Sequence, residues 1–232
     1  MTTLVLLPGM DGTGELFAPL LRTLTGSITT QVVAYPTRER LGYKELVKFV
    51  EQVLPAEDDY VLLGESFSGP IAIELAARRS SRLRGLILAC TFASNPLPTL
   101  APLRPLVGLL PSPRRITTPL TWILMGSDAT PTLQNALATA LASVEPAVLR
   151  HRAAAVLSVN TEACPSEIQC PILYLQAGQD RVVPARSAQH VHRRCPQTQI
   201  VRLEGPHLLL QTRPAEAATA IESFMSQLQP VS

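Results

Sequence analysis

Short apolar runs alternate with amphipathic stretches along most of the chain. The runs are continuous, as expected of strands that are buried on both faces. Runs of this kind predict strands at residues 4–7, 31–35, 60–63, 83–89, 171–177 and 198–203. Between them, apolar positions recur at the spacing of an amphipathic helix. These stretches predict helices at residues 15–24, 43–54, 67–79, 184–195 and 214–228.

Strands that alternate with helices favour a three-layer α/β fold, with a mostly or wholly parallel six-stranded sheet covered on both faces. The alternation stops at residues 92–167, where the first part is rich in proline. Helical patterns follow there at residues 132–143 and 146–159. We interpret residues 92–167 as an inserted helical cap, and residues 1–91 and 168–232 as the core that carries the sheet.

Composition narrows the classes of partner. The chain has 232 residues and a net charge of only +2, which fits one ordinary domain and gives no electrostatic reason to expect nucleic-acid binding. Its apolar runs are too short or too broken by proline to span a bilayer, and no signal peptide is visible. The four cysteines show no metal or redox spacing. We therefore expect a cytoplasmic protein without a membrane span.

The stretch YVLLGESFSGP at residues 60–70 predicts a strand that turns sharply into a helix, with Ser66 at the apex. Positions two before and two after such a serine must be small, and here they are Gly64 and Ser68. Ser66 is then a candidate nucleophile, although a serine here can also simply cap a helix. Ser68 is interpreted as a tolerated small residue, so Ser68→Ala should keep most activity.

A serine nucleophile needs a base and an acid that orients the base. Asp180 and His207 each follow a predicted strand, as Ser66 does, and the carboxyl ends of parallel strands meet at one edge of a sheet. Asp180 alone could be a turn residue, and His207 alone an ordinary loop histidine. Their order after three strands favours a Ser-His-Asp triad.

The glycine-rich loop at residues 8–14 follows the first predicted strand. Its backbone can approach a substrate closely, so we expect the Met10 N–H to be one oxyanion donor and the Phe67 N–H the other. A phosphate-binding loop is the rival interpretation. The loop lacks the Lys-Ser/Thr ending of a P-loop and the glycine spacing of a dinucleotide site.

The chain resembles the α/β-hydrolase superfamily, and within it small bacterial carboxylesterases such as pimeloyl carrier-protein methyl ester esterases. The resemblance is carried by LPGMDGTG at 7–14, GESFSG at 64–69, GQDRVVP at 178–184 and GPH at 205–207. It implies six strands in the family order 4-3-5-6-7-8, the family's first two strands being absent. Pro8 stands where the family usually has a histidine, and Ser68 where the elbow usually has glycine.

Together these features predict a serine hydrolase that cleaves carboxylic esters of short to medium acyl chains, without a metal or cofactor. The expected partner is a small-molecule ester, or an acyl group linked to a carrier protein or CoA. Tentative pocket residues are Phe92, Trp122, Met125 and Leu208. Thioester hydrolysis or acyl transfer on the same triad is the alternative, and a non-catalytic ligand-binding homologue is a third hypothesis.

Overall fold

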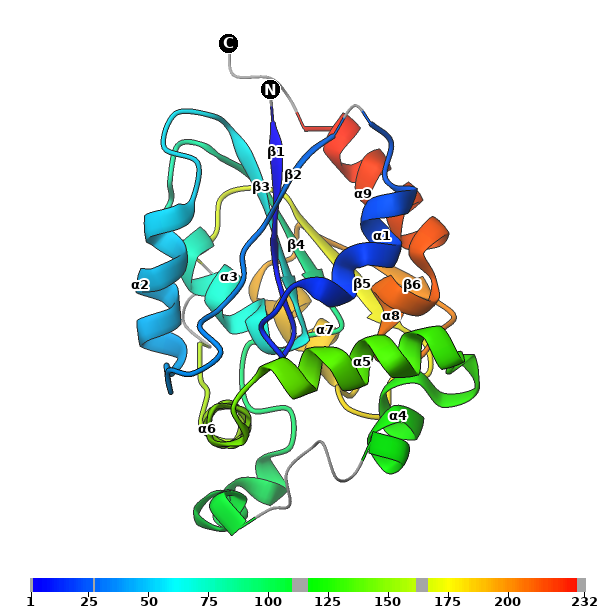
Figure 1. Ribbon diagram of the computed structural model, residues 1–232. Helices are drawn as coiled ribbons and strands as arrows, with labels where there is room; N and C mark the ends of the chain where they lie inside the picture. The colour runs from blue at the N-terminus through cyan, green and yellow to red at the C-terminus, as the bar shows by residue number, and fades with distance from the viewer. Residues whose placement is uncertain (1, 27, 110–116, 162–166, 229–232) are drawn as a thin grey trace.

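The centre of the molecule is a parallel sheet of six strands, seen in the computed structural model of Figure 1, which describes residues 2–26, 28–109, 117–161 and 167–228. The strands are β1 (Thr3–Leu7), β2 (Thr29–Val32), β3 (Tyr60–Glu65), β4 (Leu83–Ala89), β5 (Ile172–Ala177) and β6 (Thr198–Leu203). Their order is β2-β1-β3-β4-β5-β6, with every neighbouring pair parallel. The predicted fold class and strand order are confirmed.

Helices cover both faces of the sheet, which gives three layers (Figure 1). One face packs against α2 (Tyr43–Val53), α3 (Gly69–Ala77) and α7 (Arg186–Arg194). The other packs against α1 (Ala18–Thr23), α8 (Leu209–Thr212) and α9 (Pro214–Ser226). Successive strand residues alternate between the two cores: Leu62 faces the first, whereas Val61 and Leu63 face the second. Burial on both faces explains the continuous apolar runs of the sequence.

The second strand lies earlier than the predicted residues 31–35, because the chain leaves the edge of the sheet after β2. The Val33 N–H still donates to the Leu6 carbonyl at 3.0 Å. The Tyr35 N–H instead donates to the Gly12 carbonyl at 2.7 Å, which draws this segment against the glycine-rich loop. Two predicted helices also begin as short 3₁₀ turns, η1 (Glu15–Phe17) before α1 and η2 (Ser66–Ser68) before α3.

The segment between β4 and β5, called here the inserted segment (residues 92–167), is helical in its described parts. It contains η3 (Pro98–Leu109), α4 (Thr117–Met125), η5 (Gly126–Asp128), α5 (Pro131–Ser143) and α6 (Pro146–Val156). The last two match the predicted helices, and the first two were not predicted because prolines interrupt their pattern. Residues 110–116 and 162–166 of this segment lie outside the described residues. Its role as a cap stays a prediction.

Apolar packing joins the inserted segment to the rest of the molecule. Met125, Leu141 and Val148 form one buried cluster with Leu16 and Leu208, which come from the sheet-bearing part of the chain. The Leu208 N–H also donates to the Leu124 carbonyl at 3.0 Å. The segment therefore rests directly against the loops that follow β1 and β6. None of the helices in the described ranges is both long enough and apolar enough to cross a bilayer.

Candidate active site

Ser66 lies where β3 ends and the 3₁₀ turn η2 begins. Its backbone has a φ angle of 49°, in the left-handed region that costs a residue with a Cβ atom on the order of 1–2 kcal/mol. The side chain is partly exposed, unlike the buried residues on either side of it. A strained turn with an accessible hydroxyl is the geometry that the sequence predicts for the nucleophile.

Two glycines permit the turn at Ser66. A Cβ atom on Gly64 would lie 2.8 Å from the Ala72 Cβ and 2.9 Å from the Ser68 carbonyl oxygen. A Cβ atom on Gly69 would overlap the side chain of Thr91, the second residue after β4. The Thr91 hydroxyl donates to the Ser66 carbonyl, so the neighbouring strand end braces the strained residue.

The structure brings Ser66, His207 and Asp180 into one hydrogen-bonded chain. The Ser66 Oγ lies 2.8 Å from the His207 Nε2. On the other side of the ring, the His207 Nδ1 lies 3.0 Å and 2.9 Å from the two carboxylate oxygens of Asp180. An ionised carboxylate only accepts hydrogen bonds, so the Nδ1 carries the proton and the Nε2 is left to accept from the serine hydroxyl.

The loop after β5 holds the Asp180 side chain in place. The N–H groups of Val182 and Val183 each donate to the Asp180 Oδ1 at 2.8 Å. The side chains of Asp180 and His207 are only 6% and 2% exposed, so water competes little for the bond between them. This burial and the double backbone contact fix both the position of the acid and the orientation of the imidazole.

The glycine-rich loop after β1 is fixed at nearly every peptide group. The Ser68 hydroxyl donates to the Pro8 carbonyl, and the Gly12 N–H donates to the Gly9 carbonyl at 3.0 Å. By contrast, the hydrogen bonds found across the described ranges include no acceptor for the Met10 N–H. Phe67, the second residue of η2, has no carbonyl within that turn to receive its own N–H. Both predicted oxyanion donors are thus available.

Ser68 does more than leave room for the turn. Its side chain is completely buried, and its hydroxyl lies 2.6 Å from the Tyr35 hydroxyl. Because Ser68 donates its proton to the Pro8 carbonyl, it accepts the proton of Tyr35. This short relay ties the glycine-rich loop to the turn that carries Ser66. The sequence indicated only that residue 68 is small, and no spacing in the chain signals the bond.

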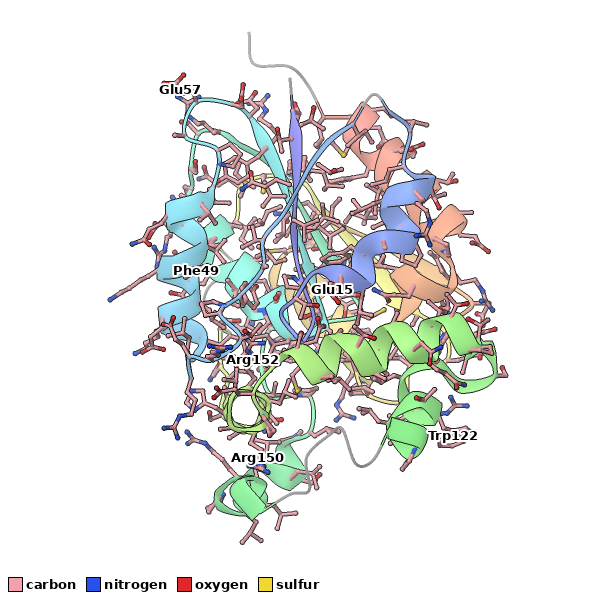
Figure 2. The ribbon with its side chains drawn as sticks, in the orientation of Figure 1. Glu15, Phe49, Glu57, Trp122, Arg150 and Arg152 are labelled. Carbon is pink, nitrogen blue, oxygen red and sulfur yellow. The ribbon has the colours of Figure 1, made fainter. Side chains whose placement is uncertain are left out.

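Arg152, on α6 of the inserted segment, reaches the same loop from the other side (Figure 2). It is only 1% exposed. Its Nη1 donates to the carbonyls of Met10 at 3.0 Å and Asp11 at 2.7 Å, and its Nη2 donates to Pro36 at 3.0 Å. The guanidinium lies 5.6 Å from the centre of the Tyr35 ring. Desolvation lowers the pKa of Arg152, yet these carbonyl dipoles and the ring face suit a buried cation. Sequence reasoning missed this residue.

Glu65, next to the candidate nucleophile, is a buried acid. Burial raises its pKa to about 7, against hydrogen bonds from Gln211 and from the Gly9 backbone that favour the charged form. The Gln211 Nε2 donates to the Glu65 Oε1 at 2.9 Å. Glu65 therefore holds the glycine-rich loop at Gly9, and α8 supplies its other partner, Gln211.

The four tentative pocket residues do not lie together. Phe92 is buried in a small cluster with Val159 and Val183. Met125 and Leu208 belong to the larger cluster of the inserted segment. Trp122 is 60% exposed on α4, with the Arg181 guanidinium 4.4 Å from its ring centre. A pocket role therefore stays a prediction for the first three, whereas the surface position of Trp122 does not support one.

The described ranges also include no cluster of three or more His, Cys, Asp or Glu side chains that could hold a metal ion. The chemistry available at the site is that of a hydrogen-bonded serine, histidine and aspartate beside two backbone donors. Such an arrangement can transfer an acyl group through the serine oxygen.

Comparisons with known proteins agree with this fold. The solved enol-lactonase of Burkholderia xenovorans superposes with a TM-score of 0.87 at 13% identity, over 97% of this chain and 92% of that one. An esterase from a Rhodococcus species gives a TM-score of 0.81 at 20% identity, over 98% and 91%. A lipase-esterase related protein of Clostridium acetobutylicum gives 0.80 at 14%, over 96% and 94%.

In sequence, the chain is 34% identical over 123 residues to phytyl ester synthase 1, a chloroplast protein of Arabidopsis thaliana. That match covers 50% of this chain and 18% of the relative, so this chain spans only a small part of that protein's length. The model described as the alpha/beta hydrolase family matches residues 4–220. With the parallel sheet, the strained serine turn and this match over most of its length, the chain belongs to the alpha/beta hydrolase family.

Proposed function

We propose that this protein is a serine hydrolase that cleaves carboxylic esters through an acyl-enzyme. The observation that carries the proposal is the unbroken chain from the Ser66 Oγ through the His207 imidazole to the Asp180 carboxylate. Membership of a hydrolase family supports the reaction class. The esterase and lactonase among the similar folds are consistent with ester chemistry.

In the first half of the reaction, the Ser66 oxygen attacks the ester carbonyl as its proton passes to the His207 Nε2. The tetrahedral intermediate collapses when the imidazolium returns that proton to the departing alcohol. A water molecule then gives a proton to His207 and attacks the acyl-enzyme, and the second tetrahedral intermediate collapses as His207 returns that proton to the Ser66 oxygen and the acid leaves. Asp180 keeps the imidazole in the required tautomer throughout and stabilises its charged form.

The oxyanion of each tetrahedral intermediate is held by the N–H groups of Met10 and Phe67. Loss of one such donor typically costs on the order of 2.7–4 kcal/mol of transition-state stabilisation. The fixed peptide groups around Met10 mean that its N–H needs little reorganisation when charge develops. Preorganisation of this kind is what makes backbone donors effective in a site that excludes water.

The inserted segment would act as the cap over this site. Its buried cluster meets Leu208, the residue after His207, and Phe92 opens the segment beside Val183 of the acid loop. Apolar walls at both places suit an acyl chain of short to medium length. A free ester is the simplest substrate, and an acyl group on a carrier protein or CoA would present the same carbonyl. We also keep the cytoplasm as the proposed location.

The test is hydrolysis of p-nitrophenyl butyrate by purified protein and its Ser66→Ala variant. The variant should lose turnover to the background level while it keeps the wild-type melting curve. A fluorophosphonate probe followed by peptide mass spectrometry should label Ser66 alone. Full activity in Ser66→Ala would remove the proposal. A folded wild-type protein that resists the probe would instead favour a non-catalytic ligand-binding role.

A second candidate function is acyl transfer to an alcohol on the same three residues. It is favoured by the 34% identity over 123 residues to a protein named a phytyl ester synthase. In this reaction an alcohol takes the place of water in the second half, so the product is a new ester. Incubating the protein with an acyl donor and a long-chain alcohol separates the two outcomes, because transfer yields the alkyl ester and hydrolysis yields free acid. Thioester donors such as acyl-CoA belong in the same panel.

A further inference from the structure

One end of the molecule carries an unusual concentration of exposed apolar side chains. Eight large hydrophobic side chains are exposed in the described ranges, and six of them belong to the inserted segment. We call these six the apolar end; they are Leu97, Leu100, Leu103, Leu106, Trp122 and Ile123, between 36% and 60% exposed. Figures 1 and 2 place α4, with Trp122, at the end of the molecule opposite the two termini.

The four leucines form one stripe. They are spaced three residues apart, and three of them lie in the 3₁₀ helix η3, which Leu97 directly precedes. A 3₁₀ helix has three residues per turn, so the three leucines within η3 lie above one another over roughly 12 Å. Isolated exposed leucines are ordinary, but four exposed leucines at this spacing in the described residues mark an interaction surface.

The charges around the apolar end select its partner. From Thr91 to Ser127 the sequence contains no aspartate or glutamate and three arginines. One of these, Arg104, is exposed within the leucine stripe, and the other two lie outside the described residues. In a face-to-face contact of two copies, Arg104 of one copy would lie near Arg104 of the other, which is unfavourable. An anionic lipid surface complements both the leucines and Arg104.

Trp122 has the amphipathic character that suits the boundary between acyl chains and headgroups. It is exposed on α4, whose carbonyl at Leu124 accepts the N–H of Leu208. The Trp122 carbonyl lies 3.3 Å from the Arg181 Nη1, one residue after Asp180. The α4 part of the apolar end is therefore attached to the loops that carry His207 and Asp180.

We propose that the apolar end docks the protein onto an anionic lipid surface. In that orientation the two loops at the candidate active site lie next to the lipid. The part of this inference that concerns substrate entry rests on the proposed function: an ester dissolved in the lipid would reach Ser66 without crossing water. The docking itself does not depend on catalysis and is tested without it.

The chain contains a single tryptophan, so its intrinsic fluorescence reports on Trp122 directly. Vesicles of phosphatidylcholine with phosphatidylglycerol should shift the emission to the blue, and brominated acyl chains should quench it. Vesicles of phosphatidylcholine alone should give a much smaller change. Unchanged emission and no co-flotation with the anionic vesicles would overturn the proposal.

The matched variants change an exposed apolar side chain to glutamate. Leu103→Glu combined with Leu106→Glu should weaken vesicle binding by at least about tenfold, because two leucines no longer leave water and two negative charges face the anionic surface. Val53→Glu, at the exposed end of α2, should bind as wild type does. Equal losses in both variants would contradict a specific docking face.

Folding and self-association are separated by two further measurements. The leucine variants should hydrolyse a water-soluble ester at the wild-type rate and keep the wild-type melting temperature. Trp122→Ala should also bind the vesicles more weakly, as measured by co-flotation. Light scattering should show a monomer without lipid. A dimer that Leu103→Glu and Leu106→Glu dissociate, together with no flotation of wild type, would assign the surface to a second copy of the chain instead.

Discussion

Glu65 is a carboxylic acid buried beside the candidate nucleophile, and its protonation couples folding to pH. Burial raises its pKa from 4.5 to about 7 in the folded protein. Between these two values the folded protein binds a proton that the unfolded chain has released. Stability contributed by this group is therefore complete below pH 4.5 and is lost as the pH rises through about 7.

Glu65→Gln should remove this dependence, because the amide is neutral at every pH and can still accept from the Gly9 backbone. The free energy of unfolding of wild type should fall by about 3 kcal/mol relative to the variant between pH 4.5 and 8. Urea unfolding across that range measures it. Glu15→Gln, at an exposed carboxylate, is the control and should follow wild type. Parallel curves for wild type and Glu65→Gln would contradict the assignment.

Ser68→Ala should separate packing from chemistry. Removing the Ser68 hydroxyl leaves the buried Pro8 carbonyl and Tyr35 hydroxyl unpaired, which should lower the free energy of unfolding by about 1–3 kcal/mol. Most ester hydrolysis should remain, since the hydroxyl touches no reacting atom. Thermal melts and kcat measure the two effects.

Ser66→Ala is the reciprocal control and should be inactive but nearly as stable as wild type. An inactive Ser68→Ala beside an active Ser66→Ala would move the nucleophile to residue 68.

At the scale of single residues, sequence reasoning predicted Ser66, Asp180 and His207 because each stands at a fixed place after a strand. The structure brings all three together. Ser68, Glu65 and Arg152 escaped it, because their roles consist of contacts with distant parts of the chain. The Arg152 bonds, for example, span more than a hundred residues. The hydrophobic periodicity of a sequence does not predict such a contact.

At the scale of elements, α6 acts through Arg152 on a loop that it does not belong to. The Arg152 guanidinium holds the Met10 and Asp11 carbonyls, which follow the Met10 N–H, the candidate oxyanion donor, along the chain. Ser68 and Glu65 hold Pro8 and Gly9, the two residues before Met10. Arg152 is thus a positioning residue rather than a catalytic one.

Arg152→Met keeps much of the side-chain volume and removes the three hydrogen bonds. We expect kcat to fall roughly 10- to 100-fold with little change in KM, because the misplaced N–H matters only when the oxyanion forms. Affinity for a trifluoromethyl ketone, which forms the same tetrahedral oxyanion, should fall in parallel. Arg152→Lys should recover part of the loss.

Arg150→Met, two residues away on the same helix, is the matched control for Arg152→Met. A folded Arg152→Met with wild-type kcat and wild-type ketone affinity would show that the arginine only stabilises the fold.

The helices were predicted well wherever the apolar pattern is regular, as in α2, α5 and α9. η3 and α4 were missed for a physical reason. Pro102 and Pro105 argue against an α-helix, and the structure forms there a 3₁₀ helix of 12 residues that contains both. Two 3₁₀ turns also preceded predicted α-helices, since the chain must tighten as it leaves the end of a strand. Local propensity does not distinguish these turns from the first turn of an α-helix.

At the scale of the whole molecule, the inserted segment and the sheet-bearing part share several kinds of contact. Besides Arg152 and the cluster around Leu208, Asp128 of η5 pairs with Arg213 at 3.1 Å. The strand order was predictable because the resemblance to the α/β-hydrolase superfamily implies it. The way in which the inserted segment folds back over the sheet-bearing part could not be predicted, since it depends on individual buried contacts.

Calorimetry should therefore show one unfolding transition, with the calorimetric enthalpy equal to the van't Hoff enthalpy. Asp128→Asn should lower its midpoint only slightly, because the ion pair with Arg213 is partly exposed. Arg213→Gln gives the same test from the other partner. Two resolved transitions, with ester hydrolysis lost in the first, would show instead that the segment unfolds as a separate unit.

The buried Arg152 also limits how the inserted segment of this protein can be exchanged for that of a relative. A segment taken from a relative would bring new walls to the site, but it would loosen the loop beneath unless it carried a cation of the same reach. Exchange of substrate preference is therefore best attempted from η3 through α5, with α6 left in place. In this protein α6 and the glycine-rich loop are joined through Arg152, so the two are best kept together in any such exchange.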